Sequence, residues 1–272
     1  MAALVALLGI GGYAFGGQNG FLLFAGIGLV ANFFSYWFSD RLALASNRAQ
    51  PLPREEAPQV YEIVERLAQR ANIPVPPIYF IPSDSPNAFA TGRGPDHSAV
   101  AVTRGLLERL DAREVEGVLA HELSHVRNRD VLVASVAAGL AGLISSIGYI
   151  MQMGMLFGGN GRERRTSPFA ALAWIIVAPI VAMLLRLAIS RSREYGADAS
   201  GARLTSNPNA LADALERLEV ESARQPYQYA GPATAHLFIV NPLRGTNARM
   251  GALLSTHPPI EERVARLRAM TV

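Results

Sequence analysis

The sequence predicts a mostly α-helical membrane protein in which two hydrophobic hairpins alternate with polar segments that hold a small β-sheet. Half of its 272 residues are hydrophobic and only 17% are charged, whereas soluble domains carry about 25% charged residues. The charged residues are also unevenly distributed, because none occurs before Asp40 or within 131–161. A His-Glu-Leu-Ser-His sequence occupies 121–125, in a polar segment next to the second hydrophobic region.

The first hydrophobic region, residues 1–39, is expected to form a transmembrane hairpin. Its arms are Ala2–Phe15 and Gly20–Trp37, and Gly16–Asn19 supplies the turn. Apolar runs of about 20 residues can cross a bilayer as helices. The first arm would span only about 22 Å at 1.5 Å per residue, so it would have to tilt or distort the bilayer. A cleaved signal peptide is the alternative, but the region lacks a basic start and its apolar stretch continues too far.

A second transmembrane hairpin is expected over 131–190, with arms at Val131–Leu156 and Phe169–Ser190 and a turn within Gly158–Ser167. Every basic residue of the chain is Arg. The arginines near the arm ends fall into two sets: Arg41, Arg48, Arg127, Arg129, Arg191 and Arg193 on one side, and Arg162, Arg164 and Arg165 on the other. The larger number of arginines on the first side predicts that the polar segments and both termini lie in the cytoplasm. The three arginines on the second side argue against this orientation.

The polar segments, 40–130 and 191–272, are expected to fold into helices and a few short strands. Helical apolar spacing and runs of β-branched and aromatic residues mark these elements. The expected helices are Glu55–Ala71, Asn207–Ser222 and Pro258–Met270, and the expected strands are Pro77–Ile81 and His97–Thr103.

A helix is also expected through the His-Glu-Leu-Ser-His sequence. Asp111 and Glu114 have the spacing of a capping box that would start it. Residues four apart share one helix face, so His121 and His125 can bind one metal ion with Glu122 beside it. Two imidazoles, a nearby carboxylate and an open coordination position suit a zinc hydrolase. A chance match is the alternative, and the helical context argues against it.

A catalytic zinc site of this kind requires a third protein ligand. The chain has no Cys, so the candidates are His97, His236, His257 or a carboxylate. Glu194 and Asp198 are four residues apart, and on a helix one could bind the metal while the other accepts the spare N–H of a ligand His. The alternative is a solvated acid pair near a membrane surface. We expect His236 to be packed in its apolar stretch, and we assign His97 no role.

Taken together, these motifs resemble the HtpX family of bacterial membrane zinc metalloproteases, which are relatives of the CaaX prenyl proteases. The matching segments are HELSH with Asn128-Arg129-Asp130, Arg193–Ala199, Asn87–Gly92, Ala235–Leu243 and Ser255–Pro259. The resemblance implies a zincin-like (gluzincin) α+β catalytic domain in which His121, His125 and Glu194 bind one Zn²⁺ and Glu122 is the general base. It also implies a multi-pass protein of the cell inner membrane, whose site faces the cytoplasm and which acts in membrane-protein quality control under stress.

Further roles are expected around the zinc ion. Asp198 would accept the spare N–H of a ligand His, and Asn128 would lie one turn beyond His125 on the zinc-facing side. Asp130 is expected to hold the helix end through a neighbouring Arg rather than to contact zinc.

His257 is the candidate donor to the oxyanion that develops during cleavage, with Arg263 as a structural or electrostatic partner. His257 could instead be a helix cap beside Pro258 and Pro259.

An extended substrate could bind by adding to an exposed sheet edge. That edge would consist of Asn87, Ala88, Phe89 and Ala90. The alternative is an ordinary buried strand.

The expected function is that of a membrane-bound zinc endopeptidase that cleaves misfolded or damaged membrane proteins at the cytoplasmic membrane surface. His125 lies six positions before Val131, which places the zinc roughly 9 Å from the bilayer end of a straight helix. An intramembrane protease fits less well, because Glu114, Arg127 and other charged residues flank the motif. A non-catalytic protein with a structural zinc would be expected to have four ligands, commonly Cys. No basic cluster suggests a nucleic-acid partner.

Overall fold

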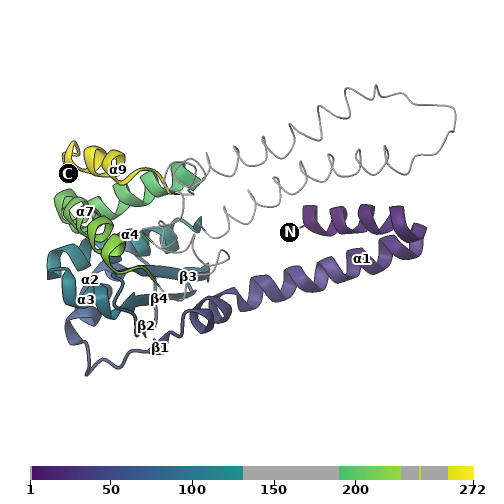
Figure 1. Ribbon diagram of the computed structural model, residues 1–272, viewed down its shortest axis with the longest axis horizontal. Helices are drawn as coiled ribbons and strands as arrows, with labels where there is room; N and C mark the ends of the chain where they lie inside the picture. Colours follow the sequence, from purple (N-terminus) through teal and green to yellow (C-terminus); the bar gives the residue numbers. More distant parts are fainter. Residues whose placement is uncertain (1, 131–189, 228–238, 240–256) are drawn as a thin grey trace. The chain divides into compact units, whose positions relative to one another are not determined.

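The computed structural model describes residues 2–130, 190–227, 239 and 257–272 (Figure 1). In chain order its elements are α1 (Ala2–Ser46), β1 (Gln50–Pro51), α2 (Pro58–Ala71), β2 (Ile78–Ile81), β3 (Ala88–Gly94), β4 (His97–Thr103), α3 (Arg104–Arg109), α4 (Ala112–Arg127), α7 (Pro208–Arg224) and α9 (Ile260–Arg268). Residues 190–205 are also helical and are called the 190–205 helix. The described residues are thus mostly helical with one small sheet, which confirms this part of the predicted fold class.

Helix α1 reverses its direction within its length, as Figure 1 shows. Gly17 has a φ of 58°, a conformation that glycine adopts readily. A Cβ built on Gly20 would lie 2.1 Å from the carbonyl oxygen of Gly12, whereas these two residues would be about 12 Å apart in a straight helix. The two backbones therefore touch, and only glycine fits at the contact.

The predicted membrane spans stay predictions. Among the helices of the described residues, none is both long enough and apolar enough to be assigned as a bilayer crossing. The second predicted hairpin, 131–190, lies outside the described residues except for Ser190.

The sheet has the strand order β1-β2-β4-β3. Strands β2 and β4 run parallel, while β1 and β3 pair antiparallel with their neighbours. Strand β3 is thus an edge strand of the described sheet. Its register shifts between Gly92 and Gly94, and Gly92 has a φ of 134° with its Cβ position 2.1 Å from the His97 carbonyl oxygen. This β-bulge lets β3 continue to Gly94, beyond the predicted edge residues Asn87–Ala90.

Helix α4 contacts strand β3 and helices α2 and α7, so it runs through the main hydrophobic core. Two glycines let neighbouring helices approach it closely. A Cβ on Gly117 would lie 2.8 Å from the backbone nitrogen of Leu211 in α7, and one on Gly201 would lie 2.9 Å from the backbone nitrogen of His121. The second contact brings the 190–205 helix against the turn of α4 that carries the metal-binding motif.

A second, smaller core covers the other side of β3. The C-terminal part of α1 contributes Ala43 and Leu44, which pack in one cluster with Phe89 and Tyr227. The hydroxyl of Tyr227 donates to Asn47 Oδ1 at 3.0 Å. The first residues of β3 are therefore enclosed by packing.

Candidate metal centre

Helix α4 begins with the predicted capping box. Asp111 Oδ1 accepts the backbone N–H groups of Arg113 and Glu114, each at 2.9 Å, and Glu114 Oε2 accepts the N–H of Asp111 at 2.8 Å. These bonds satisfy N–H groups that have no partner within the helix. The helix then continues without interruption to Arg127, so the two histidines of the motif lie one turn apart on the same face.

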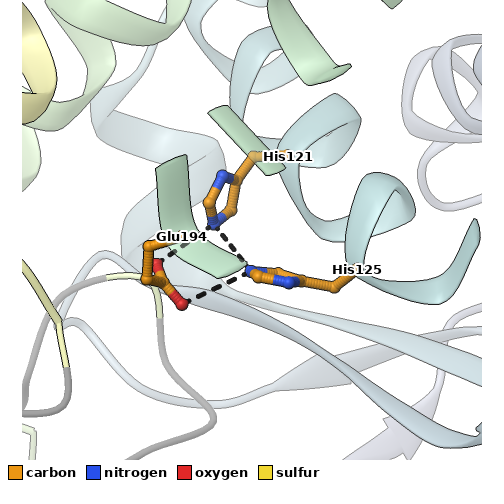
Figure 2. A group of neighbouring side chains, drawn as sticks. All are labelled: His121, His125 and Glu194. Carbon is orange, nitrogen blue, oxygen red and sulfur yellow. Dashed lines mark hydrogen bonds and ion pairs between the residues drawn. The ribbon is translucent and has the colours of Figure 1, made fainter. Parts of the chain in front are cut away.

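His121, His125 and Glu194 converge on one point (Figure 2). The Nε2 atoms of the two histidines are 3.1 Å apart. Glu194 places Oε2 3.7 Å from His121 Nε2 and Oε1 3.5 Å from His125 Nε2. A tetrahedral zinc ion with bonds of about 2.0–2.1 Å would separate its ligand atoms by about 3.3 Å. The spacing therefore fits one metal ion.

Carboxylates hold the opposite nitrogens of both rings. His121 Nδ1 donates to Asp198 Oδ1 at 2.9 Å, and His125 Nδ1 donates to Asp130 Oδ2. With both Nδ1 atoms protonated, the two Nε2 atoms present lone pairs toward the Glu194 carboxylate. Three electron-pair donors that face one another in this way fit a bound cation.

The electrostatics of the site also favour a cation. Burial raises the pKa of Glu122 to about 8, against the opposing effect of His125 and the Ala90 N–H. Burial would lower the pKa of His125, but its bond to Asp130 and the charges of Glu194 and Glu122 outweigh this effect and raise that pKa to about 9. The carboxylates around His125 thus stabilise positive charge at its ring, whereas the raised pKa of Glu122 reflects its burial.

Asp198 is held by a buried arginine as well as by His121. Arg263 is 0% exposed and donates from Nε and Nη2 to the two Asp198 oxygens at 2.8 and 2.7 Å. Its Nη1 donates to the Ile239 carbonyl oxygen at 3.2 Å. Burial would raise the pKa of Asp198, but Arg263 and His121 outweigh it and lower that pKa to about 2. Asp198 therefore remains a carboxylate beside the Nδ1 atom of His121.

His257 lies beside the third ligand. Its Nδ1 is 3.1 Å from Glu194 Oε2, and the residue is 9% exposed. The structure therefore places His257 at the site. The predicted partner Arg263 forms its short bonds with Asp198 rather than with His257.

The prediction for Asn128 is wrong. Asn128 is exposed at the C-cap of α4, whereas Asp130 is 8% exposed and binds the His125 ring. The reason is the turn at Arg129, whose φ of 55° reverses the chain and returns Asp130 toward the helix. The predicted link from Asp130 to an arginine is present, because Arg193 Nη1 donates to its backbone oxygen at 2.6 Å.

The predicted substrate edge is partly covered. Asn87, Ala88 and Phe89 are each at most 1% exposed, and the Ala88 oxygen accepts the Ile239 N–H at 3.4 Å. The Ala90 N–H donates to Glu122 Oε2 at 2.8 Å. Beyond it, a pocket opens between β3 and the end of α4, and its lining consists of Ala90, Thr91, Gly92, Arg93, Gly94, Ser98, His125, Val126 and Arg129.

The other histidines lie elsewhere. His97 is exposed at the start of β4, and His236 lies outside the described residues.

A helix that bears two histidines and a buried glutamate, with a third ligand from a second helix, is the arrangement of a metallopeptidase centre. Residues 54–271 match Peptidase family M48, and the chain belongs to this family. The protein is thus a metalloprotease, and the relationship inferred from the motifs is confirmed.

Similar proteins support this assignment along the whole chain. The chain is 51% identical to the Protease HtpX homolog of Syntrophobacter fumaroxidans, over 99% of this chain and 96% of that protein. It is 49% identical to the Protease HtpX homolog of Thermococcus sibiricus, over 98% and 92%. The crystal structure of S. mikatae Ste24p matches 97% of this chain with a TM-score of 0.62 at 19% identity. This chain spans 62% of the length of that structure, and the likeness concerns the fold alone.

Proposed function

We propose that this metalloprotease is a zinc-dependent endopeptidase that cleaves misfolded or damaged membrane proteins at the cytoplasmic surface of the membrane. The observation that carries the proposal is the position of Glu122. Glu122 is 2% exposed, directly follows the predicted metal ligand His121 in the sequence, and accepts the Ala90 N–H of edge strand β3. One side chain thus connects the expected metal to the strand at which a peptide could bind.

The chemistry of peptide cleavage follows from these positions. Bound zinc would supply an acidified water molecule as the nucleophile. Glu122 would take a proton from this water and return it to the leaving amine, as a general base and then a general acid. Its bond to the Ala90 N–H fixes the carboxylate so that the second oxygen is available for the proton. His257, next to Glu194, would donate to the oxyanion.

The substrate would extend along β3 from Ala90 toward Gly94. Edge strands bind extended chains through main-chain hydrogen bonds, and the open pocket begins at Ala90. Recognition through main-chain groups would give broad specificity, which suits unfolded segments of many different proteins.

The membrane location is supported by the N-terminal region. Residues 1–39 carry no charged side chain, and several large apolar side chains of α1 are more than half exposed. These are Leu22, Leu23, Ile27, Leu29, Val30, Phe33 and Phe34. An apolar surface of this kind is unfavourable in water, and a lipid bilayer would cover it.

The substrate class is tested by reconstituting the zinc-loaded protein into vesicles with a model multi-span membrane protein. One substrate version carries a destabilised cytoplasmic loop, and its matched control carries the stable loop. We expect cleavage within the destabilised loop only, and none when the protease carries Glu122→Gln. Equal cleavage of both loops, or cleavage confined to the opposite side of the membrane, would contradict the proposed role.

A further inference from the structure

Asp130 and Arg193 join the two helices that carry the metal ligands. Asp130 follows the end of α4, and its carboxylate accepts the His125 Nδ1 hydrogen. Arg193 precedes Glu194 on the 190–205 helix, and its Nη1 donates to the Asp130 backbone oxygen at 2.6 Å. His125 and Glu194 are therefore both linked to Asp130, one directly and one through the neighbouring arginine.

The His125 side of the site has little other support. His121 is completely buried, is backed by the close approach of Gly201, and bonds an aspartate that Arg263 holds in turn. The His125 side chain is 18% exposed, on the side of the substrate pocket. Its ring orientation thus depends on Asp130.

We propose that Asp130 is a positioning residue that holds the His125 ring for metal binding, and that Arg193 keeps Asp130 in place against the helix that carries Glu194. A carboxylate at Nδ1 fixes the tautomer and the direction of the metal-binding nitrogen, and it increases the basicity of the ring. The bond from Arg193 fixes the turn at residues 128–130 and hence the position of that carboxylate. The proposal rests on the zinc centre proposed above, but not on the proposed substrates.

Zinc affinity tests the proposal without any substrate. Detergent-purified protein is freed of metal, and zinc is titrated in competition with a coloured chelator. Asp130→Ala should bind zinc about 10- to 100-fold more weakly than the parent. Asp130→Asn keeps an acceptor oxygen without the charge, so it should lose less affinity. Arg127→Ala, an exposed change at the end of the same helix, is the matched control and should bind zinc as the parent does.

The role of Arg193 is tested by a double-mutant cycle. Arg193→Gln alone should weaken zinc binding, and it should add little to Asp130→Ala, because its effect acts through the Asp130 carboxylate. The visible spectrum of the Co²⁺-loaded protein should change in Asp130→Ala, because the ring of one ligand is no longer held in place. A merely structural role would lower the unfolding temperature and leave the spectrum unchanged.

Three results would overturn the inference. The first is parent-like zinc affinity in both Asp130 variants, and the second is an unchanged Co²⁺ spectrum in Asp130→Ala. The third is full additivity of the Asp130 and Arg193 effects, which would show that Arg193 acts independently. Failure of the parent itself to bind zinc would instead overturn the zinc centre.

Discussion

Asp198 connects the metal-binding residues to a buried arginine. It accepts hydrogen bonds from His121 Nδ1 and from two nitrogens of Arg263, which is 0% exposed. Removal of the carboxylate would leave the guanidinium buried without its main counter-charge. Breaking a buried pair from one side costs about 3–5 kcal/mol.

Asp198→Ala should therefore lower the free energy of unfolding by about 3–5 kcal/mol, measured by denaturant titration of the metal-free protein. The control is Glu262→Ala, which removes the exposed partner of Arg266 on α9 and should cost at most about 1 kcal/mol. An Asp198 variant as stable as the Glu262 variant would mean that Arg263 does not depend on this ion pair.

His257→Ala should reduce kcat with the zinc content unchanged. His257 Nδ1 is 3.1 Å from Glu194 Oε2, so it lies beside the third predicted metal ligand. Loss of one oxyanion donor typically lowers kcat by about 10²- to 10³-fold. Steady-state cleavage of a peptide, with zinc measured on the same sample, separates the two quantities. Normal turnover with full zinc would show that His257 does not donate to the oxyanion.

At the scale of single residues, the sequence could predict which side chains share one face of a helix. His121 and His125 are four residues apart on α4, and Glu194 and Asp198 are four residues apart on the 190–205 helix. Asp130 was missed as the partner of His125 because it follows a left-handed residue at 129, where helical spacing no longer applies. Nothing about the residue type of Arg129 indicated that it would adopt this left-handed conformation.

The stability of the start of helix α4 depends on the Asp111 side chain. Asp111→Ala removes the acceptor for two backbone N–H groups and should cost about 0.5–2 kcal/mol. Asp111→Asn keeps an acceptor and should cost less. Thermal unfolding at pH 7 measures both changes, and equal stability of the parent and the Ala variant would contradict the capping role.

The same cap predicts a pH dependence. The hydrogen bond from the Glu114 backbone holds the pKa of Asp111 below its usual value, with Arg113 acting in the same direction. A carboxyl with a lowered folded-state pKa contributes stability above its unfolded pKa of about 3.9 and loses it as the pH falls through the folded value. The stability advantage of the parent over Asp111→Asn should therefore shrink below about pH 4. An advantage that stays constant down to pH 2.5 would rule out this contribution.

The contact between the 190–205 helix and α4 depends on Gly201. Its Cβ position is 2.9 Å from the backbone nitrogen of His121. Gly201→Ala should therefore force the helices apart and lower the free energy of unfolding by about 1–3 kcal/mol. Gly196 lies in the same helix with nothing within 4 Å of its Cβ position. Gly196→Ala is thus the matched control and should be neutral or stabilise by up to about 1 kcal/mol. Denaturant unfolding compares the two variants, and an equal effect of both would show that the approach to α4 is not tight.

Among the elements, the helices were easier to predict than the substrate strand. Apolar spacing located α2, α4 and α7 within a few residues of their observed bounds. The edge expected at Asn87–Ala90 located the start of β3 but not its extension to Gly94, which depends on the bulge at Gly92. Nor could the sequence show that Ile239 bonds the start of this strand, because that contact joins residues far apart in the chain.

For the whole molecule, metal binding should stabilise the fold as well as support catalysis. The ligands come from two different helices, so an ion held by His121, His125 and Glu194 joins parts of the chain that are far apart in sequence. A ligand that binds only the folded state at 100 times its Kd adds about 2.7 kcal/mol. This contribution is lost when a chelator removes the ion.

The most direct test is cleavage of casein, an unfolded substrate, by detergent-purified protein that is made metal-free and then given zinc. Zinc content is measured on the same samples of the parent and of Glu122→Gln. We predict one zinc per chain in both, zinc-dependent cleavage by the parent, and a loss of about 10²- to 10⁴-fold in the variant, because general acid–base catalysis typically contributes that much. Cleavage by Glu122→Gln at the parent rate, or cleavage by the parent without any metal, would contradict the assignment of Glu122 and the metal centre.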